Sequence, residues 1–183
     1  MSPYKTLVDL KGKNLGLVDP NSTSGYNMPL YALDKRGTPA ADKYFSKVEI
    51  TGSHENAVLA LVQGTIDVCA NWWNAMDDSN LTRMLTKYMV KNADGTPMKV
   101  SDFRIVLKSD LVINSPHAML TSLPADLKAR INKVFLDAAS ADKAAFDKLS
   151  DGKNLPWQPI TNADYADTMK MIQFVDALRK KAA

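Results

Sequence analysis

Three hydroxyl side chains in succession, followed by a glycine, form the clearest candidate for chemistry in this sequence. The run is Ser22, Thr23, Ser24 and Gly25. It lies where an apolar strand, expected at 13–18, should give way to a helix that continues to about residue 35. The first N–H groups of a helix lack partners inside the helix, and this end carries partial positive charge. Together with the hydroxyl donors, these groups suit an oxyanion. Ordinary helix capping by one hydroxyl is the alternative interpretation.

Two further polar loops follow the next two expected strands, at 48–50 and 66–70. The first leads into a helix at 54–63 through Ser53 and His54, and the second contains Asn71, Trp72, Trp73 and Asn74. Ligands of open α/β sheets bind at the carboxyl ends of the strands, so the three loops should share one edge. The imidazole could donate to an anion, and the indoles and amides could wall a small pocket. A water-facing histidine, and tryptophans in the core or in an interlobe contact, are the alternatives.

Charge and catalytic motifs limit what these loops could do. None of the three loops contains Lys or Arg, so an anion there would be held by neutral dipoles and by His54. Ser22 or Ser24 with His54 and Asp67 or Asp19 have the residue types of a nucleophilic triad, but the G-x-S-x-G pattern is absent. The phosphate-binding G-x-x-x-x-G-K and the dinucleotide-binding G-x-G-x-x-G patterns are absent too. We therefore assign no catalytic residue, metal ligand or cofactor.

Composition indicates an ordinary globular protein. The 183 residues are 45% hydrophobic and 23% charged, with a net charge of +3 that is too small to indicate nucleic-acid binding. The single cysteine, Cys69, excludes an internal disulfide and is expected to be a small buried hydrophobe. No segment has the ~20 consecutive apolar residues of a membrane span, and the first residues lack a signal-peptide core.

The order of elements predicts an α/β fold. Strands and helices alternate over the first third, which is typical of a parallel sheet with crossover helices. We further expect a helix at 74–90 and a strand at 103–107. The remainder should be mostly helical, at 124–139, 141–149 and 162–181. The composition changes from mixed α/β to helical near 108–115.

Several motifs resemble those of the phosphonate/phosphite-type substrate-binding proteins of ABC importers. They are Asp-Leu-Lys-Gly-Lys at 9–13, Asp-Pro-Asn-Ser-Thr-Ser-Gly at 19–25, Gly-Ser-His-Glu at 52–55, Gly-Thr-Ile-Asp-Val at 64–68, Asp-Phe-Arg-Ile-Val-Leu-Lys-Ser at 102–109 and Leu-Pro-Ala-Asp-Leu-Lys at 123–128. The resemblance implies a type II periplasmic binding fold of two lobes, a periplasmic location, and a permease as partner. It implies that Ser22, Thr23, Ser24 and His54 donate to the oxygens of a phosphorus oxyanion.

The resemblance also shows departures. Asn74 stands where the family can have an acid for a ligand amine, and a second acidic position falls near Ser115. A smaller oxyanion without an amine is therefore expected. Residues 1–108 would be the second lobe, and 109–183 an incomplete return to the first.

Because family members are longer at the N-terminus, we expect a truncated, split or mis-started chain, or an engineered fragment. Its affinity in isolation would be modest, and apolar helix faces around Ile131, Val134 and Phe135 would be open to self-association. The alternatives are a sensory or regulatory domain of the same fold, and a remnant that binds nothing.

Overall fold

The computed structural model describes residues 3–87, 89–149 and 152–182. The chain divides into two compact units, one of Met1–Val112 with Thr168–Ala183 and the other of Ile113–Asp167. The expected lobe boundary at 108/109 differs from this division, because the last residues return to the first unit. The assignment of these parts to lobes of a binding protein remains a prediction.

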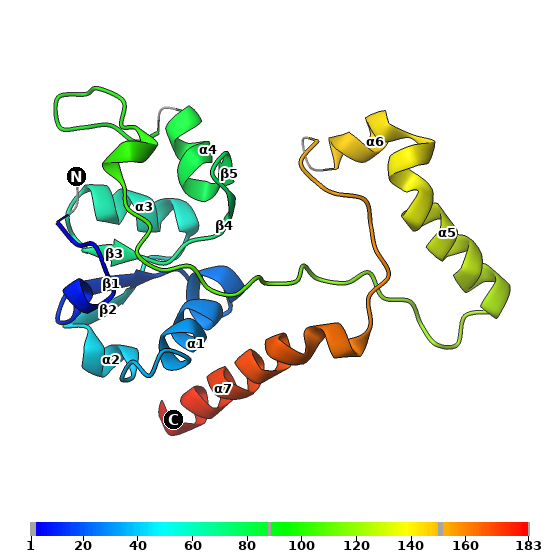
Figure 1. Cartoon of the computed structure of the whole chain (residues 1–183), viewed down its shortest axis with the longest axis horizontal. Coiled ribbons are helices and arrows are strands. Elements are labelled where there is room, and N and C mark those ends of the chain that lie inside the picture. The colour runs from blue at the N-terminus through cyan, green and yellow to red at the C-terminus, as the bar shows by residue number, and fades with distance from the viewer. Residues whose placement is uncertain (1–2, 88, 150–151, 183) are drawn as a thin grey trace. The chain divides into compact units, whose positions relative to one another are not determined.

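A three-stranded parallel sheet lies at the centre of the first unit (Figure 1). β1 (Asn14–Leu17) is the middle strand, with β2 (Lys47–Ile50) on one side and β3 (Val68–Cys69) on the other. Both neighbours pair with β1 in parallel, which requires a crossover connection each time. The structure thus confirms the parallel α/β arrangement expected from the sequence.

Helices fill the crossovers. α1 (Met28–Asp34) and α2 (Ala41–Tyr44) connect β1 to β2, and α3 (His54–Val62) connects β2 to β3. A wide π-helical turn, η2 (Thr23–Asn27), precedes α1. Its hydrogen bonds span five residues and end just before Pro29, which has no N–H to donate and falls in the first turn of α1.

Two apolar clusters hold the first unit together. The first contains Leu10 of η1 (Val8–Leu10), two leucines of β1, Leu33 and Phe45, all less than 9% exposed. The second joins Val58 of α3 to Leu81 and Met84 of a later helix and to Val90 beyond it. The first cluster thus packs α1 on β1, and the second packs α3 on a helix later in the chain.

Two expected elements are wrong. The helix expected at 74–90 is replaced by the hairpin of β4 (Trp73–Ala75) and β5 (Asp78–Ser79), and only then by α4 (Asn80–Thr86). The Ser79 hydroxyl caps the amino end of α4, so the helix begins there. The strand expected at 103–107 is also absent from the part of the chain that the structure describes. It follows η3 (Val100–Asp102), and its Val106 and Leu107 side chains pack on the first cluster without a β-ladder.

The second unit is helical, as expected. α5 (Ala125–Ala141) and α6 (Lys143–Lys148) follow the long extended segment, and the 3₁₀ turn η4 (Asn162–Tyr165) comes before the last helix. The centre of the second unit is aromatic. The His117 ring lies 4.2 Å from the Trp157 ring and 5.0 Å from the Phe135 ring, centroid to centroid.

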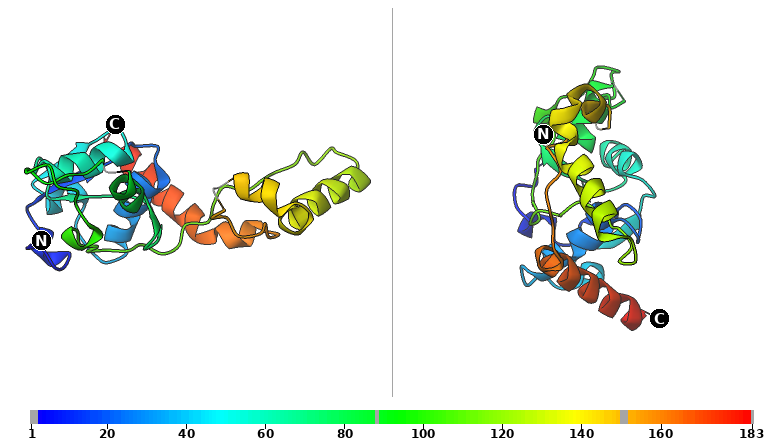
Figure 2. Two further views of the ribbon diagram at one scale, coloured as in Figure 1. Left: turned by 90° about the horizontal axis from the view of Figure 1, so that it is seen from above. Right: turned by 90° about the vertical axis from the view of Figure 1, so that its right-hand side faces the viewer.

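The last helix, α7 (Ala166–Ala182), begins four residues later than predicted and packs on the first unit from Thr168 onward. Met171 and Val175 are buried there, and the ring centroids of Phe174 and Tyr31 lie 5.6 Å apart. This half of α7 lies beside α1 in the views of Figures 1 and 2.

Among the helices of the described residues, none has both the length and the apolar character that crossing a membrane requires.

Candidate functional site

The first candidate loop follows β1 and ends in the turn η2. Ser22 has an extended backbone, with φ −75° and ψ 121°, and its Oγ accepts a hydrogen bond of 3.0 Å from the Gly25 N–H. A hydroxyl that accepts this bond can still donate its own proton. Thr23 and Ser24 open the turn, where backbone N–H groups lack helical acceptors. The loop therefore presents hydroxyl and N–H donors together.

Val18, the residue after β1, connects this loop to the next one. Its N–H donates to the Gly25 carbonyl at 2.9 Å, and its carbonyl accepts from the Gly52 N–H at 2.8 Å. Val18 is only 4% exposed. A Cβ at Gly25 would lie 2.4 Å from Val18 Cγ2, so only glycine lets the loop pass this close. The two loops are thus held side by side by one strand end.

The second loop repeats the capping arrangement of the first. Gly52 has a φ of +82°, which turns the chain from β2 toward α3. Ser53 is the N-cap, and its Oγ accepts a hydrogen bond of 3.0 Å from the Asn56 N–H. Its hydroxyl proton also remains able to donate. Two capped helix starts therefore lie at the same sheet edge, as the sequence predicted.

His54 joins the two loops. Its Nε2 lies 3.4 Å from the Ser24 Oγ. Burial lowers the pKa of His54 below its ordinary value, and the Asn71 amide and the Glu55 charge, which raise it, do not offset this effect. The neutral imidazole is therefore favoured near pH 7, with one nitrogen that donates and one that accepts. Nδ1 is buried and has no hydrogen-bond partner among the residues that the structure describes.

A nucleophilic triad is not assembled around this contact. The Asp67 carboxylate accepts bonds from the Tyr4 hydroxyl at 3.0 Å and the Asn14 N–H at 2.9 Å, at the amino end of β1. The Asp19 carboxylate accepts from the Asn21 N–H at 2.8 Å. Within the described ranges, no carboxylate orients the imidazole, and no cluster of three or more His, Cys, Asp or Glu could hold a metal ion.

The third loop contacts the second through Asn71. Its Nδ2 donates to the His54 carbonyl at 3.0 Å, and its Oδ1 accepts from the Trp72 N–H at 2.9 Å. Both ends of this amide are engaged within the protein, so Asn71 positions the loop; its expected ligand contact remains a prediction. Trp72 and Trp73 are partly buried just beyond β3.

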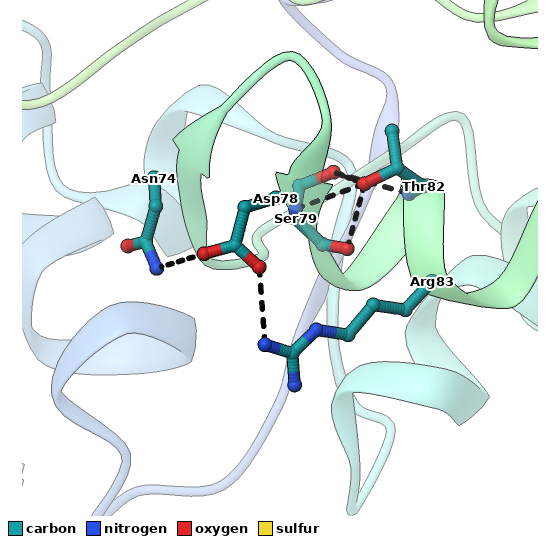
Figure 3. Close-up of polar contacts among 5 residues, drawn as sticks. All are labelled: Asn74, Asp78, Ser79, Thr82 and Arg83. Carbon is teal, nitrogen blue, oxygen red and sulfur yellow. Dashed lines mark hydrogen bonds and ion pairs between the residues drawn. The ribbon is translucent and has the colours of Figure 1, made fainter. Parts of the chain in front are cut away.

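Asn74 belongs to a small polar network (Figure 3). Its Nδ2 donates to Asp78 Oδ2 at 2.9 Å, and Arg83 Nη2 pairs with Asp78 Oδ1 at 3.0 Å. The buried Ser79 and Thr82 cap α4 reciprocally, with Thr82 N–H to Ser79 Oγ at 3.1 Å and Ser79 N–H to Thr82 Oγ1 at 2.9 Å. The bond to Asp78 fixes the Asn74 amide with its oxygen turned away from the carboxylate.

The fold adds cations that the loops themselves lack. The Arg83 guanidinium lies 4.8 Å from the centroid of a ring of Trp72, and Lys108 Nζ lies 5.3 Å from that of Trp73. Arg179 of α7 donates to the Pro20 carbonyl in the first loop. Sequence reasoning missed all three. Only Arg83 carried a local signal, because the Ser-x-x-Thr pattern before it marks a helix start.

Ser115 belongs to the second unit and is exposed. Its expected ligand contact remains a prediction, as do the contacts of the residues in the three loops.

Comparisons with known proteins identify the family of the chain. The model of the family described as "ABC transporter, phosphonate, periplasmic substrate-binding protein" matches residues 1–165. The chain is 27% identical over 154 residues to the phosphonates-binding periplasmic protein of Escherichia coli, covering 81% of this chain and 41% of the relative. It is 27% identical over 177 residues to the phosphate-import protein PhnD of Mycolicibacterium smegmatis, covering 87% of this chain and 50% of the relative.

Solved structures support the fold. Structures of XAC2383 from Xanthomonas citri, one bound to ATP and one to chloride ion, match with TM-scores of 0.59 and 0.58 at 22% identity. Each match covers 98% of this chain, and 64% and 63% of the other chain respectively. The chain spans about half the length of the curated relatives it matches. It belongs to the family of periplasmic substrate-binding proteins of phosphonate ABC transporters.

Proposed function

We propose that this chain forms the anion-binding part of a substrate-binding protein that captures a phosphorus oxyanion and delivers it to an ABC permease. One observation carries the proposal. Two helix starts, at Ser22–Gly25 and Ser53–His54, meet at one sheet edge, and Ser24 Oγ lies 3.4 Å from His54 Nε2.

The donors of this site suit a tetrahedral oxyanion. Ser22 and Ser53 use their oxygens to cap helices, so their hydroxyl protons can point outward. The orphan N–H groups of η2 and the positive end of α3 add further donors. Hydrogen bonds to an ionised group contribute about 1.5–3 kcal/mol each, so three or four could hold a small anion reversibly.

The two relatives are named for different ligands, phosphonates in one and phosphate in the other. The proposal is therefore made for phosphorus oxyanions as a class. Asn74 and Ser115 themselves carry no carboxylate for a ligand amine, and the Asp78 carboxylate beside Asn74 is paired with Arg83. This favours phosphite, methylphosphonate or phosphate over an aminoalkylphosphonate.

Isothermal titration calorimetry of the chain with these three anions, and with sulfate for comparison, tests the proposal. We expect Ser22→Ala and His54→Ala to weaken binding by about tenfold or more, because each removes a hydrogen bond to a charged group. Ser46→Ala is the matched control, since Ser46 is exposed and precedes β2 at the amino end of the sheet. Unchanged affinity in both site variants would refute the site.

A further inference from the structure

Lys108 is the residue that brings positive charge to the tryptophan side of the site. Its Nζ lies 5.3 Å from the centroid of the Trp73 ring, within the range of a cation–π interaction. Trp73 follows Asn71 by two residues, which span at most about 7 Å of chain. Because Asn71 is bonded to the His54 carbonyl at 3.0 Å, a short run of chain connects the ring that holds the ammonium to the second loop of the candidate site.

The neighbouring cations are already engaged. Arg83, over Trp72, forms an ion pair with Asp78 at 3.0 Å. Arg179 donates to the Pro20 carbonyl. Within the described ranges, Lys108 pairs with no carboxylate, so its charge is not neutralised by an acidic partner. A positive charge that no acidic side chain neutralises can attract a dissolved anion electrostatically.

The segment that carries Lys108 is fixed to the first unit. Arg36 Nη2 donates to the Lys108 carbonyl at 3.1 Å, and Lys35 Nζ pairs with Asp110 Oδ2 at 2.6 Å. Both partners lie just past the carboxyl end of α1, the helix that follows the turn η2. The backbone that carries Lys108 is therefore anchored to the crossover that begins at Ser22–Gly25.

We propose that Lys108, held over Trp73, supplies the charge that attracts the oxyanion to a site whose own donors are neutral. This inference rests on the proposed function and names a residue that determines how strongly anions are captured. It predicts binding that weakens with ionic strength, because an exposed charge is screened within about 8–10 Å at physiological salt.

Tryptophan quenching tests the local charge without any ligand. In a Trp157→Phe background the remaining indoles are Trp72 and Trp73. One unit charge at about 5 Å, partly screened, changes the local concentration of a monovalent ion by about twofold. Lys108→Gln should therefore lower the Stern–Volmer constant for iodide and raise that for caesium, while acrylamide quenching stays the same. Lys108→Arg should behave like the parent.

Calorimetry with phosphite at two ionic strengths tests the capture. We expect Lys108→Gln to weaken binding about two- to fivefold and to flatten its salt dependence. Lys11→Gln, which removes the same charge from an exposed residue before β1, should do neither. Equal affinities of the Lys108→Gln and Lys11→Gln variants for phosphite would overturn the role of Lys108 and leave the proposed function standing. Affinity lost in Lys108→Arg would overturn it too, because packing would then matter rather than charge. A parent chain that binds no phosphorus oxyanion would overturn the proposed function, and the capture role with it.

Discussion

Replacing Gly25 with alanine should destabilise the first unit through a single contact. The added methyl carbon would lie 2.4 Å from Val18 Cγ2 and 2.5 Å from Val18 Cβ, against about 3.5–4.0 Å for an ordinary carbon–carbon contact. Val18 cannot retreat easily, since it is 4% exposed and its N–H and carbonyl are bonded to Gly25 and Gly52. Overpacking of this kind costs about 1–3 kcal/mol. Loss of the Ser22 cap on the Gly25 N–H would add about 1 kcal/mol.

The expected fall in the free energy of unfolding is therefore about 2–4 kcal/mol. Urea unfolding followed by tryptophan fluorescence in a Trp157→Phe background measures it, because Trp72 and Trp73 both lie in the first unit. A double-mutant cycle with Val18→Gly, which removes both clashing atoms, should recover most of the penalty as coupling energy. A Gly25→Ala variant within about 0.5 kcal/mol of the parent would refute the close approach of loop and strand.

Three further predictions concern His54, Cys69 and Ser79. Because burial lowers the pKa of His54 in the folded state, the unfolded state binds more protons, and the free energy of unfolding should fall as the pH drops below about 6.5. His54→Asn should flatten this pH dependence, measured as unfolding midpoints between pH 8 and 5. An unchanged slope would contradict the assignment. Burial raises the pKa of Cys69 to about 12, so a disulfide reagent at pH 8 should label the thiol only after unfolding. Rapid labelling of the native chain would contradict the burial of this thiol. Ser79→Ala removes the cap of α4 and should lower the free energy of unfolding by about 1–2 kcal/mol, whereas Ser101→Ala at an exposed position should change it little.

The parallel sheet and the two capped helix starts could be predicted because their signals are local. Apolar residues from Leu15 to Val18 indicate a buried strand, and hydroxyl residues in the loops after the strands at 13–18 and 48–50 indicate helix starts. Parallel pairing then follows from the alternation of strands and helices. The contact between Ser24 and His54 joins two such local features at one edge of the sheet. That these two residues lie near each other was therefore predictable, whereas the distance between them was not.

The helix expected at 74–90 fails for a physical reason that the apolar periodicity does not show, although the Ser-x-x-Thr pattern at 79–82 marks the later helix start. Ser79 caps α4 with its own side chain, and the residues before it satisfy their backbone in the hairpin of β4 and β5. A continuous apolar period cannot reveal where a cap interrupts it. The sequence did not predict the contact of Lys108 with Trp73 for a different reason, because only tertiary packing brings these two residues together.

In the proposed site, neutral donors would select the ligand and a separate positive charge would attract it. Hydroxyl and N–H donors select by direction, since each must meet a lone pair of the ligand, whereas an ammonium attracts any anion. A site of donors alone would also favour a fully ionised oxyanion over one that keeps a P–OH group, because that proton needs an acceptor. In the proposed site, the partly buried, neutral imidazole of His54 would serve beside Ser24 as an acceptor for a P–OH group in one tautomer and as a donor to an oxygen in the other. Sulfate, which carries no proton near pH 7, could use only the donor tautomer, so we expect His54→Ala to change the preference between phosphorus oxyanions and sulfate more than Lys108→Gln does.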